Sequence, residues 1–171
     1  MIIVVFMALA SISAFAQVAE TTKSAAAKPK AEAIPGRVKF DPLRDPKVDL
    51  ENAIAAASSK GLNIILDVGG EWCGWCVFMD KFFYLNADLV KLRDENFVWI
   101  KVNFSDENHN AIFLASYPAA SGYPHLYVLD SAGKLLKSQD TVDLEGTSGY
   151  DLAKFTTFLK TWSPIKQGLL P

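Results

Sequence analysis

Both cysteines of this chain, Cys73 and Cys76, lie in one segment, "LDVGGEWCGWCVFMDKFF" at residues 66–83. The short apolar run at 62–68, with its β-branched residues, predicts a buried strand just before the pair. A helix is expected to start inside the cysteine motif. The two thiols are therefore expected where a strand ends and a helix begins.

Three roles compete for this cysteine pair. A structural disulfide at this spacing would close a very small loop and remove little entropy from the unfolded chain, so it is a poor staple. A metal site would need His109 and His125 as further ligands, and these two histidines lack the close spacing of a zinc motif. A redox-active dithiol fits a pair that follows a strand and opens a helix, and it is the favoured interpretation.

The chemistry of thiol exchange explains this placement. The free N–H groups and the dipole at a helix N-terminus favour a thiolate over a thiol. Cys73 is expected at the exposed first turn, with Cys76 one turn further along and more buried. The first thiolate would attack a partner's disulfide, and the second thiol would resolve the mixed disulfide.

An amphipathic helix is predicted at 48–60, with Asp49 as its cap and Gly61 at its end. Helices are also predicted at 87–96, 107–117 and 150–162, and strands at 97–104, 124–130 and 134–140. Early strands alternate with helices and the last two strands form a hairpin, so an α/β fold is expected, with a central mixed sheet flanked by helices on both faces. A short strand at 36–40 is expected at one edge, and Leu152, Phe155, Leu159 and Trp162 are expected to face inward from the last helix.

The N-terminal residues predict export from the cytoplasm. Residues 1–16 are interpreted as a signal peptide, with cleavage after the Ala14-Phe15-Ala16 motif and a mature start near Gln17. Residues 17–36 have few large apolar side chains and are interpreted as a flexible linker. Residues 37–171 then form one domain.

Composition excludes some partners. The formal net charge is -2 and no basic stripe is present, which argues against nucleic acid. Half of the residues are hydrophobic, enough for a core without staples. A small, mildly acidic domain is compatible with a monomer.

The sequence "DVGGEWCGWC" resembles the active-site segment of the thioredoxin superfamily. Three further positions match that pattern. Asp67 precedes the first cysteine by six residues, as does the buried aspartate of thioredoxins. Lys101 matches the lysine that lies near that aspartate on the following central strand. Pro124 in "GYPHLYVLD" matches the cis-proline that faces the disulfide. The resemblance covers about residues 40–163 and implies the thioredoxin fold.

The resemblance also implies roles. Cys73 would be the nucleophile and Cys76 the resolving thiol, with Asp67 as proton acceptor and Lys101 modulating it. Trp72, Gly74, Trp75, Tyr123 and Pro124 would bind the partner protein. Simpler structural alternatives remain open: Asp67 as a strand-end cap, Lys101 as a surface lysine, Trp75 as surface packing and Pro124 as a strand start.

One departure from the pattern affects the redox poise. Trp75 stands where thioredoxin has proline and where many oxidising relatives have histidine. The W-C-G-W-C form most resembles a group of secreted thioredoxin-like proteins. His125 takes the place of the usual threonine and is expected to be structural.

The expected protein is a periplasmic or secreted thiol–disulfide oxidoreductase that reduces disulfides in cysteine-containing partner proteins. It would draw electrons from a membrane-embedded donor and need no cofactor or metal beyond the Cys73–Cys76 disulfide. The alternatives are a disulfide oxidase or isomerase, and a binding module with a thioredoxin fold but no catalysis.

Overall fold

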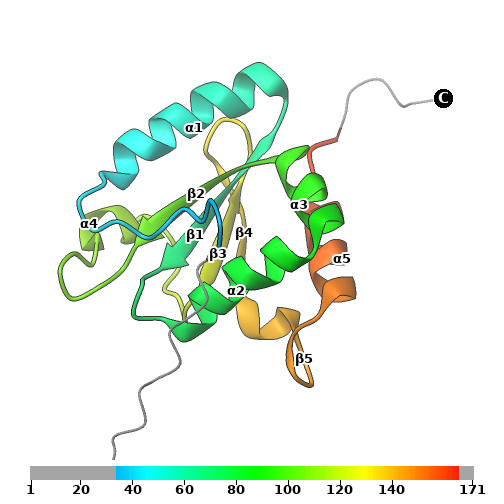
Figure 1. Cartoon of the computed structure of the whole chain (residues 1–171). Coiled ribbons are helices and arrows are strands. Elements are labelled where there is room, and N and C mark those ends of the chain that lie inside the picture. Colours follow the sequence, from blue (N-terminus) through cyan, green and yellow to red (C-terminus); the bar gives the residue numbers. More distant parts are fainter. Residues whose placement is uncertain (1–33, 166–171) are drawn as a thin grey trace, which may run out of the picture. The chain divides into compact units, whose positions relative to one another are not determined.

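The computed structural model describes residues 34–165 (Figure 1). The predicted signal peptide at 1–16 and most of the predicted linker at 17–36 lie outside the described residues. The elements, in chain order, are α1 (Pro46–Lys60), β1 (Asn63–Gly69), α2 (Gly74–Leu85), α3 (Ala87–Asp94), β2 (Phe97–Asn103), α4 (Ala111–Leu114), β3 (His125–Leu129), β4 (Leu135–Asp140), η1 (Thr141–Leu144), β5 (Glu145–Gly146), β6 (Gly149–Tyr150) and α5 (Leu152–Trp162).

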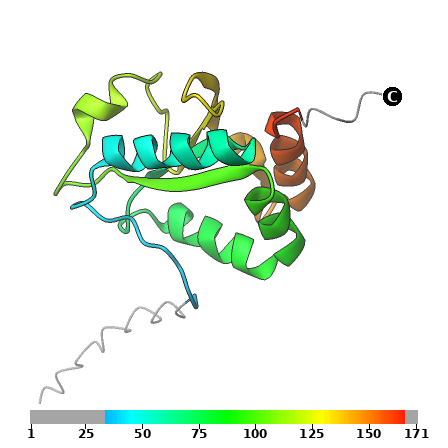
Figure 2. The ribbon, with the colours of Figure 1, turned by 90° about the horizontal axis from the view of Figure 1, so that it is seen from above.

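A mixed sheet with the strand order β2-β1-β3-β4 forms the centre of the described domain. Strand β1 runs parallel to β2 and antiparallel to β3, and β3 forms the predicted hairpin with β4. Helix α1 covers one face of the sheet, while α2, α3 and α5 cover the other (Figure 1 and Figure 2). The predicted α/β fold with helices on both faces is confirmed.

Strand β1 determines what lies beneath the cysteine helix. All of its residues are buried, as expected for a strand with neighbours on both sides and helices on both faces. Leu66 and Val68 belong to the core cluster on the α1 face, whereas Ile65 belongs to the cluster on the opposite face. Because side chains alternate along a strand, Asp67 and Gly69 share the face of Ile65. A carboxylate is therefore placed on the face that α2 covers.

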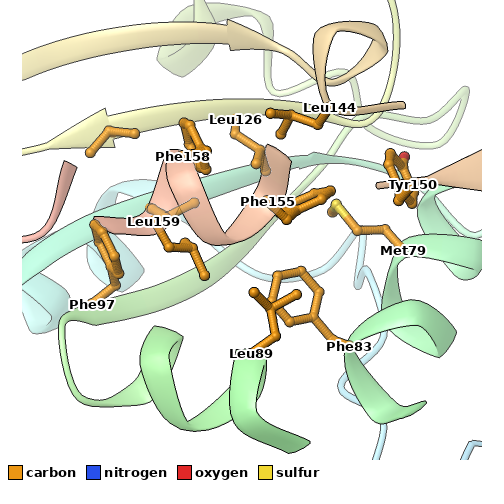
Figure 3. Close-up of a cluster of buried hydrophobic side chains, with 12 residues drawn as sticks. Met79, Phe83, Leu89, Phe97, Leu126, Leu144, Tyr150, Phe155, Phe158 and Leu159 are labelled. Carbon is orange, nitrogen blue, oxygen red and sulfur yellow. The ribbon is translucent and has the colours of Figure 1, made fainter. Parts of the chain in front are cut away.

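The core cluster on the face opposite α1 joins α2 and α5 to the sheet. Figure 3 shows Met79 and Phe83 of α2 close to Phe155 and Leu159 of α5. The inward positions of Phe155 and Leu159 were predicted correctly, but Leu152 is 48% exposed. It is the first residue of α5, and helical side chains lean toward the N-terminus, which carries this one beyond the packed layer.

Helix α1 begins earlier than the sequence indicated. Asp45 is the N-cap and accepts a hydrogen bond from the Lys47 N–H, so the prediction of Asp49 as the cap was wrong. Asp49 lies inside the first turn and pairs with Arg44 instead. Gly61 ends the helix in the left-handed conformation with φ 65°, as predicted.

The helix predicted at 107–117 is reduced to the single turn α4. The preceding residues are held by asparagine side chains that bond to backbone groups. Asn110 donates to the Asn103 carbonyl oxygen at 2.7 Å, and Asn108 accepts from the Asn110 N–H at 2.9 Å. Such local bonds compete with helical ones, which apolar periodicity does not reveal.

The edge strand predicted at 36–40 is not formed, and β2 and β4 are the two edges of the described sheet. The segment is held by side-chain contacts in place of a strand ladder. Arg37 pairs with Glu71, and Phe40 is buried against the cysteines. Lys101 was predicted on a central strand, but it lies on the edge strand β2.

The short η1 helix and the β5–β6 hairpin were not predicted from the sequence. Among residues 34–165, each helix falls short of the length and apolar character that a bilayer crossing needs.

Candidate active site

The two cysteines form a disulfide at the N-terminus of α2. Cys73 is the N-cap, and its Sγ accepts a hydrogen bond from the Cys76 N–H at 3.1 Å. Gly74 faces open space, with no atom within 4 Å of where a Cβ would lie. The backbone amide beside Sγ would equally stabilise a Cys73 thiolate after reduction.

Both cysteines are more buried than the sequence indicated. Cys76 is 0% exposed and Cys73 only 4%, so the order of burial was predicted correctly but the expected exposure of Cys73 was wrong. Phe40 is buried in one cluster with the two cysteines, and Tyr123 packs against it. Gly69 permits a close approach from below, since a Cβ there would lie 2.5 Å from Cys76 Sγ.

Asp67 is fully buried on β1, two residues before Gly69 and on the same face of the strand. Its Oδ2 accepts hydrogen bonds from Lys101 at 3.0 Å and from Trp99 at 3.2 Å. Within the described residues, Oδ1 has no hydrogen-bond partner. Burial raises the pKa of the Asp67 carboxyl above its usual range, although Lys101 offsets part of the effect. A buried carboxyl of this kind is suited to proton exchange.

Lys101 is not a surface lysine, since its side chain is 9% exposed. It pairs directly with Asp67 in the register of the parallel strands β2 and β1, which brings both side chains to one face. Its Nζ also donates to Asp80 Oδ1 at 2.8 Å and lies 4.0 Å from the centre of the Phe40 ring. The sequence prediction that Lys101 lies near Asp67 is thus matched by the geometry.

Several residues of this cluster were missed from the sequence, namely Arg37, Phe40, Glu71, Asp80 and Trp99. Only Asp80 had a usable signal: it follows Cys76 by four residues on α2, which places both on one helix face.

The Tyr123–Pro124 peptide bond is cis, as the resemblance implied. Because Val68 pairs with His125 across β1 and β3, Pro124 lies next along the chain, level with Gly69 and hence near the disulfide. Thr141 donates to the Pro124 carbonyl oxygen at 2.7 Å and fixes this turn.

Two aromatic surfaces flank the cysteines. Trp72 is 59% exposed, donates to the Phe104 carbonyl oxygen at 2.6 Å and meets Tyr123 edge to face. Trp75 is 44% exposed and lies edge to face against Phe78. Both tryptophans therefore expose apolar area beside the disulfide.

The two histidines contact residues other than the cysteines. His125 is buried, and its Nε2 lies 2.8 Å from Ser138 Oγ. Burial lowers the pKa of His125, which favours a neutral, structural imidazole. His109 stacks on Phe104. Within 34–165, no group of His, Cys, Asp and Glu side chains is arranged to hold a metal ion.

Comparison with known proteins agrees with this geometry. A family model described as Thioredoxin-like matches residues 45–131. Thiol:disulfide interchange protein DsbD from Pseudoalteromonas atlantica is 26% identical over 86 residues, which cover 50% of this chain and 14% of that protein. The chain spans less than a fifth of the length of the curated relatives it matches.

Solved structures match the fold. A disulphide isomerase from Xylella fastidiosa Temecula1 is 21% identical, with a TM-score of 0.63 over 73% of this chain and 96% of that one. The oxidised C-terminal domain of DsbD from Neisseria meningitidis is 17% identical, with a TM-score of 0.54 over 73% and 99% of the two chains. These likenesses show the thioredoxin fold.

Proposed function

This chain belongs to the thioredoxin-like family and carries the paired cysteines of a thiol–disulfide oxidoreductase; on that premise, we propose that it reduces disulfide bonds in partner proteins of the periplasm. The charge balance behind the disulfide supports reduction, rather than oxidation, of the partner. There the cations Lys101 and Arg37 are paired with the carboxylates Asp67, Asp80 and Glu71.

That balance bears on the redox poise. A strong oxidant stabilises its reduced form by stabilising the thiolate. The cluster behind Cys76 has no excess of positive charge. It therefore stabilises a thiolate, and with it the reduced state, only slightly. A dithiol in such surroundings gives up its electrons more readily, which favours a reductase.

The reaction proceeds in two exchanges. The Cys73 thiolate attacks one sulfur of the partner's disulfide, and the other partner sulfur leaves as a thiolate. The Cys76 thiol loses its proton and attacks Cys73 Sγ, which breaks the mixed disulfide and forms the Cys73–Cys76 disulfide. Two electrons have passed from the dithiol to the partner, whose two sulfurs take up protons.

Asp67 is the proposed acceptor for the Cys76 proton. Because the pKa of Asp67 is raised, its carboxylate binds a proton more tightly than an ordinary carboxylate does. Its pKa is therefore closer to that of a thiol, as general base catalysis requires. Lys101 holds one oxygen of Asp67, and the other accepts no hydrogen bond from the described residues.

The partner would bind across the aromatic surfaces around the disulfide. Trp72 and Trp75 supply apolar contact, and Gly74 leaves room for a partner's backbone. The main chain at Tyr123 and Pro124 would pair with an extended peptide. The substrate class is therefore a protein disulfide in an extended segment.

Location and electron supply are part of the same proposal. The predicted signal peptide directs the chain to an oxidising compartment, where disulfides accumulate. A reductase there needs its own disulfide reduced again, and a membrane-embedded dithiol donor supplies the electrons. The domain would act as a monomer.

Reduction of insulin tests the activity. The purified chain, with dithiothreitol as the electron source, is expected to accelerate insulin precipitation, and Cys73→Ser is expected to abolish the acceleration. A wild-type chain that is no faster than dithiothreitol alone would refute the proposed function and favour a binding module.

A further inference from the structure

A continuous chain of ion pairs leads from the buried centre to the surface. Lys101 Nζ bridges Asp67 at 3.0 Å and Asp80 at 2.8 Å. The Arg37 Nε donates to the other oxygen of Asp80, and the two terminal nitrogens of Arg37 donate to the two oxygens of Glu71, each at 2.8 Å. Side-chain exposure rises from 0% at Asp67 to 40% at Glu71.

Arg37 is the cation that ties the N-terminal segment into this chain. Its side chain is 10% exposed, and all three of its guanidinium nitrogens donate to carboxylates. The same Glu71 accepts from the Phe40 N–H at 3.0 Å, and the Phe40 ring packs on the disulfide and beneath Lys101. The guanidinium fork therefore holds Glu71 by two parallel hydrogen bonds and Asp80 by a third, a geometry that an ammonium group does not provide.

We propose that Arg37 is a positioning residue of the redox centre, acting on Asp67 through Asp80 and Lys101. By occupying one oxygen of Asp80, Arg37 leaves the other for Lys101 and so fixes Lys101 between the two aspartates. This inference rests on the proposed function, because it assigns Arg37 a part in the proton exchange at Cys76.

The direction of the effect follows from charge. Without Arg37, Asp80 keeps Lys101 as its cation and draws it away from Asp67. The region also loses one positive charge, so protons bind more tightly to Asp67 and to the thiols. Arg37, Asp80 and Lys101 line a surface pocket together with Arg93 and Asp94. Arg93 and Asp94 pair with each other at 2.7 Å, so they leave this charge balance unchanged.

The test is the pH profile of thiol exchange. The reduced full chain is mixed with a small-molecule disulfide, and the rate of Cys73–Cys76 disulfide formation is followed against pH. Arg37→Gln is expected to move the midpoint to higher pH by about half a unit or more. Arg37→Lys keeps the charge without the fork, so a smaller shift in the same direction is expected.

Arg44→Gln is the matched control, since Arg44 lies in the same segment but pairs with Asp49 at the start of α1. Its profile should coincide with that of the wild type. An Arg37→Gln profile that coincides with both overturns the inference and leaves the proposed function standing. A wild type that forms no reversible disulfide overturns both. If Arg37→Gln does not fold, as judged by urea unfolding, a wild-type profile for Arg37→Lys overturns the inference.

Discussion

Lys101 and Asp67 face each other across the parallel strands β2 and β1, with Lys101 Nζ 3.0 Å from Asp67 Oδ2. The pair lies on the sheet face that α2 covers, and a close contact between Gly69 and Cys76 brings the disulfide to the same strand. The pair places a charged group in the core where an apolar residue would pack more favourably. That cost in stability is the basis of the first prediction.

Asp67→Asn is expected to stabilise the domain at neutral pH by about 1–3 kcal/mol. The substitution replaces a buried carboxylate, one oxygen of which has no partner among residues 34–165, by a neutral amide. Because the pKa of Asp67 is raised in the folded state, the folded wild type binds more protons than the unfolded chain between the two pKa values. Wild-type stability therefore falls as pH rises through that window.

Urea unfolding across pH checks this prediction. The advantage of Asp67→Asn should be largest above the folded pKa of Asp67 and should fade below the unfolded value of about 3.9. Asp106→Asn, at a fully exposed aspartate, serves as control and should track the wild type. An advantage that persists unchanged at low pH would contradict the account.

Cys76→Ser is expected to trap the partner, because the mixed disulfide on Cys73 can form but cannot be resolved. Cys73→Ser should trap far less, since Cys76 is fully buried. Mass spectrometry of the chain after mixing with a protein disulfide would show the adduct. Equal trapping by both variants would refute the assignment of Cys73 as the attacking thiol.

Trp75→Ala is expected to lower kcat/KM for a protein disulfide by about five- to ten-fold, the effect of one exposed aromatic contact. Its rate with a small-molecule disulfide should change little, since such a substrate does not cover Trp75. Tyr84→Ala, at an exposed aromatic on the same helix, is the control. Equal losses on both substrates would indicate a change in the disulfide itself and not in docking.

Phe40→Ala is expected to destabilise the domain by about 3–5 kcal/mol, the usual cost of emptying a buried phenylalanine site. It should also open Cys73, so reduction by dithiothreitol should accelerate. Val38→Ala, in the same segment but 68% exposed, should leave both quantities unchanged. Unfolding and reduction rates measured side by side would reveal whether Phe40 covers the disulfide.

The parts of the site that depend on local sequence could be predicted. The placement of Cys73 and Cys76 follows from a strand, a turn and a helix that are contiguous in the chain. Asp67 and Lys101 were identified by resemblance, and the strand register brings them together.

The parts that depend on distant pairs could not be predicted. Arg37 and Asp80 are separated by 43 residues, and no periodicity links them. The segment at 36–40 has the composition of a strand, yet Arg37 joins the chain of ion pairs and Phe40 packs on the disulfide, and no strand forms there. At 107–117, the asparagine bonds to the backbone outweighed the helical pattern.

The reduction potential of the Cys73–Cys76 pair would distinguish a reductase from a donor of disulfides. The purified chain would be equilibrated in dithiothreitol buffers and its disulfide content followed by tryptophan fluorescence, which Trp72 and Trp75 beside the disulfide should change. A reductase should have a potential near that of thioredoxin, about -270 mV. A value near the strong-oxidant end, about -120 mV, would contradict the account and make the protein a donor of disulfides.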